Sequence, residues 1–166
     1  MATGRSPNAA AAALQRSVDA ALQSYADRGV FRGFSAADGP RGTRHYRFTW
    51  LTRRPTTVVF ARTTATLSFA QLFPHVTGTP GVVASLREEV RHRTTSAVPV
   101  HRRIDRRRAE VTALVRDGAL SLRVRLNGRD GTAAVRATLA LVNDLFLLLQ
   151  ERYPEYLVAH FGFKDE

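Results

Sequence analysis

Residues 108–127 constrain the fold more than any other part of the chain, because they alternate around an Asp-Gly pair. Asp117-Gly118 is the dipeptide best suited to a two-residue type I′ turn between antiparallel strands. One register places apolar residues opposite each other at every second position: Val115–Leu120, Ala113–Leu122, Val111–Val124 and Ala109–Leu126. A slip of one residue would turn Arg123 and Arg125 into the core. This register therefore predicts a hairpin whose outer face carries both arginines, with Arg125 opposite Glu110.

Further strands are predicted upstream of this hairpin. In residues 44–51, Tyr46, Phe48 and Trp50 alternate with His45, Arg47 and Thr49, the period of a strand. Shorter β-branched or alternating runs lie at residues 30–36, 56–61 and 66–72. Together with the hairpin, they predict an antiparallel sheet of five to six strands.

Helical spacing of apolar residues predicts three main helices. One begins at Pro7 or Asn8 and runs to about Ala26, one begins at Thr79-Pro80, and the longest spans Thr132 to Arg152. A short helix follows Pro154. We expect a disordered lead over residues 1–7 and one α+β domain over residues 8–166. Its order is α, three or four β, α, β, β, α, with the helices on one face of the sheet.

The longest predicted helix is apolar over more than one face. Leu141, Leu145 and Leu148 widen its apolar stripe, which leaves two alternatives: burial beneath the first helix, or an interface of a homodimer. The sequence has no run of 18 apolar residues, so no membrane contact is expected and a cytoplasmic location is predicted. The absence of cysteine excludes disulfides and thiolate metal sites.

Positive charge is concentrated in the middle of the chain. The sequence has 25 basic residues against 14 acidic ones. Residues 41–62 contain six arginines and no acid, and residues 87–129 contain twelve arginines against five acids. Clustering of this kind is typical of a protein that binds a polyanion, most often nucleic acid.

The candidate phosphate-binding arginines lie in this basic region. They are Arg47, Arg53, Arg54, Arg102, Arg103, Arg106, Arg107, Arg108, Arg123 and Arg125. Five of them fall in residues 101–108, a run suited to phosphate contacts or to a charged, protected edge strand. In either case we expect this run to contribute little packing, so that glutamine replacements leave folding intact.

Other candidate sites are weaker. The rings of Tyr46, Phe48 and Trp50 suit a base-stacking platform, but a sheet covered by helices needs such residues in its core, and core is the favoured interpretation. Gly128, Arg129 and Gly131 form a loop that could hold an anion or simply begin a helix. The five histidines show no metal-ligand spacing and no catalytic motif is present, so neither a metal, a cofactor nor an enzymatic activity is expected.

The sequence thus predicts a non-enzymatic module that binds nucleic-acid phosphates through a broadly basic, arginine-rich outer face of the sheet and through residues 101–108. The alternative is a chaperone-like adaptor that dimerises through its helices and binds an acidic protein. The order of elements is similar to that of type III secretion chaperones and related small bacterial interaction domains, without a shared residue motif.

Overall fold

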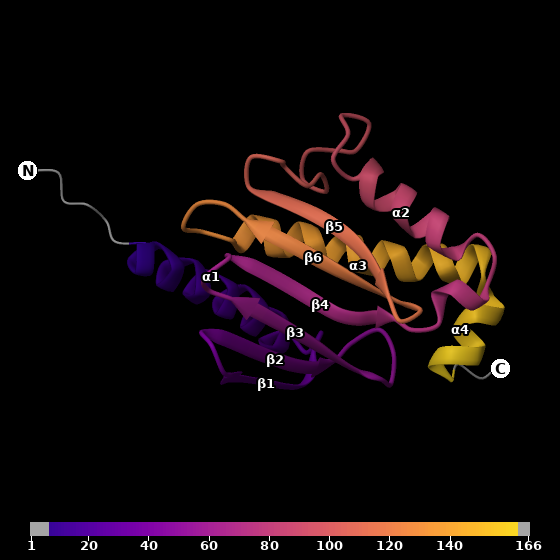
Figure 1. The fold of residues 1–166 in the computed structure, drawn as a ribbon, viewed down its shortest axis with the longest axis horizontal. Coiled ribbons are helices and arrows are strands. Elements are labelled where there is room, and N and C mark those ends of the chain that lie inside the picture. The colour runs from indigo at the N-terminus through magenta and orange to yellow at the C-terminus, as the bar shows by residue number, and fades with distance from the viewer. Residues whose placement is uncertain (1–6, 163–166) are drawn as a thin grey trace, which may run out of the picture.

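The computed structural model describes residues 7–162 and contains one six-stranded antiparallel sheet in the order β1-β2-β3-β4-β6-β5 (Figure 1). The strands are β1 (Arg32–Asp38), β2 (Thr43–Thr49), β3 (Pro55–Ala61), β4 (Thr66–Phe73), β5 (Ala109–Arg116) and β6 (Ala119–Leu126). The helices are α1 (Pro7–Asp27), α2 (Val82–His92), α3 (Thr132–Arg152) and α4 (Pro154–Phe161), with a 3-10 turn η1 (Val76–Gly78). The predicted α+β class is confirmed. The predicted lead lies outside the described residues except for Pro7, which begins α1.

The hairpin forms in the predicted register from Ala109↔Leu126 to Arg116↔Ala119. Asp117 and Gly118 both have positive φ, 52° and 77°, as a type I′ turn requires. Arg123 and Arg125 are exposed, whereas the alternate residues of β6 are buried. Glu110 lies opposite Arg125, but no ion pair joins these two described side chains.

Two elements begin two or more residues later than predicted. Strand β1 begins at Arg32, because the N–H groups of Val30 and Phe31 donate to the Tyr25 carbonyl at the end of α1. Helix α2 begins at Val82 and not at Thr79-Pro80, because Thr79 is extended and Gly81 takes the left-handed conformation with φ 87°. A Cβ atom on Gly81 would lie 2.8 Å from the Tyr153 hydroxyl, so the glycine also permits a close approach to the end of α3.

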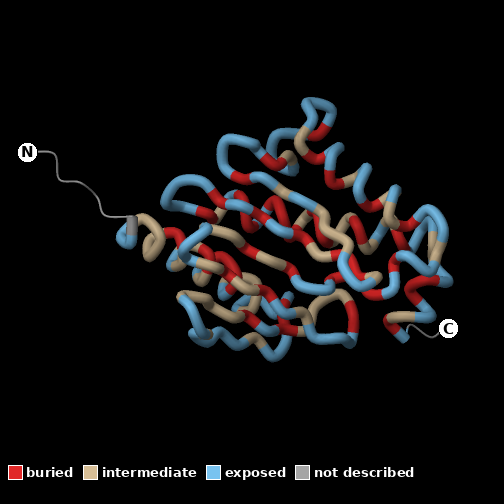
Figure 2. Tube along the Cα trace, viewed as in Figure 1, coloured by how far each residue is buried: buried red, intermediate tan, exposed pale blue. Residues whose placement is uncertain are grey.

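The core lies between the inner face of the sheet and the helices α1 and α3, which run behind the strands in Figure 1. Buried residues alternate with more exposed ones along β2, β3 and β6, as the tube in Figure 2 shows. Tyr46 and Phe48 are fully buried and Trp50 is half-buried just beyond β2, so this aromatic stripe belongs to the core. No helix within residues 7–162 covers the opposite, outer face of the sheet.

Helix α3 has the predicted bounds and supplies much of the core. Leu141 and Leu145 are fully buried within the chain and Leu148 is half-buried, which favours burial beneath α1 over an exposed dimer interface. By length and composition α3 is the one described helix that could cross a membrane, but the core helix of a folded domain meets the same criterion. Its burial against α1 and the sheet is that of a core helix.

Candidate nucleic-acid interface

Four loops meet at one end of the sheet, at the left of Figure 1, and hydrogen bonds join them in a row. The Arg62 N–H donates to the Gly42 carbonyl (3.1 Å), which links the β3–β4 turn to the β1–β2 turn. The Leu126 N–H donates to the Ala65 carbonyl (2.8 Å), which links the end of β6 to the β3–β4 turn. The Asn127 N–H donates to the Arg108 carbonyl (2.9 Å), which adds the segment before β5.

These loops bring together six exposed arginines, which we call the basic end: Arg41, Arg62, Arg107, Arg108, Arg125 and Arg129. Arg108 lies 3.9 Å from Asp105, and Arg62 donates from Nε to the Gly42 carbonyl. The other four guanidinium groups have no hydrogen-bond or ion-pair partner among residues 7–162. They are therefore available to an external anion.

Four acids lie near the basic end: Asp105 lies 3.9 Å from Arg108, Glu110 lies opposite Arg125, and Asp38 and Asp130 make local contacts. Asp38 pairs with Arg44 (3.2 Å), and the carboxylate of Asp130 accepts a hydrogen bond from the Thr132 N–H (2.9 Å). The hydrogen bonds from Thr132 lower the pKa of Asp130. The six arginines outnumber these four carboxylates, so the local excess of charge is positive.

The outer face of the sheet is basic on one side only. Arg123 and Arg125 of β6 lie opposite Ser68 and Thr66 of β4. Arg47 is also exposed, but it lies on β2, three strands and about 14 Å away. The positions between them carry small or β-branched side chains, which include Val59 and Ala61. The sequence predicted a broadly basic face, whereas the charge is concentrated near β6.

Arg53 and Arg54 do not join the other candidates. They lie in the loop between β2 and β3, at the end of the sheet where Thr49 pairs with Pro55. The basic end is at the opposite end, where Thr43 pairs with Ala61. Arg53 and Arg54 are therefore exposed but are not part of the basic end.

The arginine run before β5 is a turn-rich segment and not an edge strand. Arg102 pairs with Asp144 of α3. Arg103 donates to the Val98 carbonyl (2.9 Å) and to the Ser96 carbonyl (3.2 Å), so Arg102 joins this segment to α3 and Arg103 stabilises the preceding loop. The expectation that the whole run can be replaced without affecting folding stays a prediction, and these contacts argue against it for Arg102 and Arg103. Of its other arginines, Arg106 donates to Thr94 Oγ1 (3.2 Å), and Arg107 and Arg108 belong to the basic end.

A buried arginine missed by the sequence analysis anchors this segment. Arg93 is only 3% exposed, and it pairs with Glu89 (3.4 Å) and with Asp144. Its carbonyl accepts a hydrogen bond from Ile104 N–H (3.0 Å), and Ile104 is buried in the core. Burial, together with the neighbouring Arg102, lowers the pKa of Arg93. The spacing of Glu89 and Arg93, one helical turn apart, was the only available signal in the sequence.

The predicted anion-binding loop has fewer free backbone N–H donors than expected. The Gly131 N–H donates to Ser17 Oγ (2.8 Å) and the Thr132 N–H to Asp130, so these backbone donors are already used. Gly131 is also buried. Of Gly128, Arg129 and Gly131, only the side chain of Arg129 contributes to the basic end.

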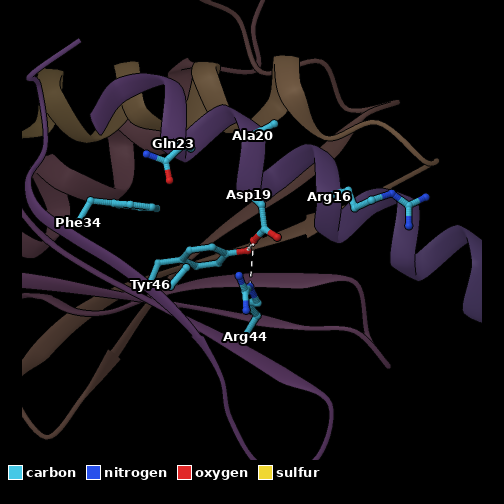
Figure 3. A pocket seen from close by; sticks show the side chains of 8 residues that line it. Arg16, Asp19, Ala20, Gln23, Phe34, Arg44 and Tyr46 are labelled. Carbon is cyan, nitrogen blue, oxygen red and sulfur yellow. Dashed lines mark hydrogen bonds and ion pairs between the residues drawn. The ribbon is translucent and has the colours of Figure 1, made fainter. Parts of the chain in front are cut away.

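A groove of about 350 Å³ lies between α1 and strands β1 and β2 (Figure 3). The Tyr46 hydroxyl donates to Asp19, and Arg44 Nε donates to the same carboxylate (3.2 Å). Burial raises the pKa of Tyr46, and its hydrogen bond to Asp19 raises it further, so the phenol stays protonated. This cluster fastens β2 to α1. Sequence reasoning missed it because Asp19 and Tyr46 lie in different predicted elements.

The buried phenols give a pH prediction. Burial also raises the pKa of Tyr156, whose hydroxyl donates to the Pro74 carbonyl (2.5 Å). Both folded pKa values lie above the unfolded value of about 10, so their stabilisation is complete below that pH and is lost as pH rises above it. We expect the free energy of unfolding to fall by about 3 kcal/mol between about pH 9 and about pH 11 through these two groups. Urea titrations of the parent chain and of the Tyr46→Phe/Tyr156→Phe variant measure this, and equal pH dependence in both would contradict it.

Among residues 7–162, no three His, Asp or Glu side chains gather in a way that could hold a metal ion. His75 and His160 stack with ring centroids 5.0 Å apart, without such a third ligand. No family model matches the chain, and no curated protein or solved structure is significantly similar to it.

Proposed function

We propose that the protein is a non-enzymatic binding module that engages nucleic-acid phosphates through its basic end. The observation that carries this proposal is the row of hydrogen-bonded loops that gathers six exposed arginines from four separate segments. Four of these guanidinium groups lack a partner within the described chain. Arginine is well suited to phosphate because its planar fork donates two parallel hydrogen bonds.

Arg123 extends the basic end onto the outer face of the sheet, next to Arg125 on the same strand. Neighbouring side chains on β4 are short, so a bulky polyanion can approach the sheet without steric conflict. Contacts made only to phosphates would give affinity with little dependence on base sequence.

The alternative, a chaperone-like adaptor that dimerises through its helices, has less support. Its predicted interface residues Leu141 and Leu145 are fully buried within the chain. Large exposed apolar side chains within residues 7–162 are limited to Val30, Val100, Leu147 and Val158, which come from four different segments. An apolar docking face would need more of them together.

The experiment compares two variants that lose the same charge. One replaces Arg107, Arg125 and Arg129 of the basic end with glutamine. The other replaces Arg87, Arg136 and Arg152, which are exposed on α2 and α3. We expect the first variant to bind a nucleic-acid duplex at least about tenfold more weakly than the parent chain, and the second to change the affinity by less than about threefold.

Fluorescence anisotropy at fixed low salt measures both affinities. Equal losses in the two variants would mean that net charge and not the basic end determines binding. Absence of binding by the parent chain at low salt would overturn the proposal and favour an acidic protein as the partner.

A further inference from the structure

We infer that the nucleic acid at the basic end is double-stranded and is bound through its two phosphate backbones, without base stacking; this inference rests on the proposed function. Proteins that bind single strands combine a basic groove with exposed aromatic side chains on which successive bases stack. This chain has exposed basic residues but lacks the exposed aromatic side chains within the described part. No Phe, Tyr or Trp among residues 7–162 is exposed.

The aromatic rings on the inner side of the sheet pack against one another. Phe31 stacks on Phe48 with ring centroids 3.9 Å apart and meets the edge of Trp50 at 5.5 Å. Tyr46 is fully buried and donates its hydroxyl to Asp19. Phe31, Phe48 and Tyr46 cannot turn toward a base without opening the core, and the half-buried Trp50 lies at the opposite end of β2 from the basic end.

The outer face next to the basic end also lacks a stacking surface. Its central positions on β3 and β4 carry Val59, Ala61, Thr66 and Ser68. On β2, the ring of His45 is held by a hydrogen bond with Thr43 (3.1 Å) and lies against the β1–β2 turn. A single strand laid across this face would gain phosphate contacts but no partners for its bases.

The extent of the basic end suits a duplex. From Arg41, beside β2, to Arg107, beside β5, the row crosses four strand intervals, or about 19 Å at the usual spacing. The major groove of B-form DNA is about 12 Å wide, so such a row is long enough to reach the phosphates on both of its sides. A duplex also offers a higher density of negative charge than a single strand.

The test compares probes that carry the same number of phosphates: a DNA duplex of about 20 base pairs, an RNA duplex of the same length and a thymidine strand of about 40 nucleotides. Anisotropy at low salt gives the three dissociation constants for the parent chain and for the Arg107→Gln/Arg125→Gln variant. We expect at least one duplex to bind about tenfold more tightly than the single strand, and the variant to lose most of that preference. The two duplex probes distinguish DNA from RNA, and preference for either one supports the inference.

Equal or tighter binding of the single strand by the parent chain would overturn the inference while leaving the proposed function in place. A duplex preference that the variant retains in full would also overturn it, because the basic end would then not be its source. Failure of all three probes to bind would overturn the proposed function itself.

Discussion

Replacement of Leu145 by aspartate is expected to abolish the folded state. Leu145 is fully buried on α3, inside the core formed with the sheet and α1. The variant would bury a carboxylate with no partner and would also lose the packing of the leucine, a combined cost of more than about 4 kcal/mol. Such a loss is comparable to the whole stability of a small domain.

The matched control is Leu147→Asp, two positions further along the same helix. Leu147 is 52% exposed, so the same change in helix propensity and charge occurs there without burial of the carboxylate. We expect Leu147→Asp to change the free energy of unfolding by less than about 1 kcal/mol. Thermal unfolding followed by circular dichroism measures both variants. A cooperative transition at the parental temperature in Leu145→Asp would show that this face of α3 is not part of the core.

Arg93→Met is expected to destabilise the fold by about 3 kcal/mol, because it leaves the carboxylates of Glu89 and Asp144 without their buried partner. Asp144 retains Arg102, which limits the cost. The exposed Arg91 of α2 provides the control, and Arg91→Met should change the free energy of unfolding by less than about 0.5 kcal/mol.

Urea unfolding of Arg93→Met, Asp144→Leu and the double variant completes the test as a double-mutant cycle. We expect the double variant to be more stable than the sum of the single effects predicts, because neither buried charge is then left alone. An Arg93→Met variant as stable as Arg91→Met would show that the buried ion pairs do not anchor the segment before β5.

Local patterns were sufficient to predict the hairpin and the longest helix. The alternation around Asp117-Gly118 excludes other registers, and the bounds of α3 follow from the glycine-containing loop before Thr132 and from Pro154 after it. The start of α2 could not be read in this way. It depends on the left-handed Gly81 and its approach to Tyr153, which lies far along the sequence.

The site was predictable only in part, because its composition depends on strand order. Arg125 could be placed on the outer face from the hairpin alone. That Arg62 and Arg41 lie near it requires β4 to pair with β6 across the intervening α2, which no local pattern indicates. Arg102 was predicted to contact phosphate, whereas it pairs with Asp144, 42 residues away.

The salt dependence of duplex binding by the unmodified protein tests the central claim most directly. Each arginine–phosphate contact releases counterions, and log affinity falls linearly with log salt at about 0.9 per contact for B-form DNA. If the six arginines of the basic end make these contacts, the slope is expected to be about −5. A slope near zero, or no binding at about 50 mM salt, would contradict the assignment of the basic end as a phosphate-binding surface.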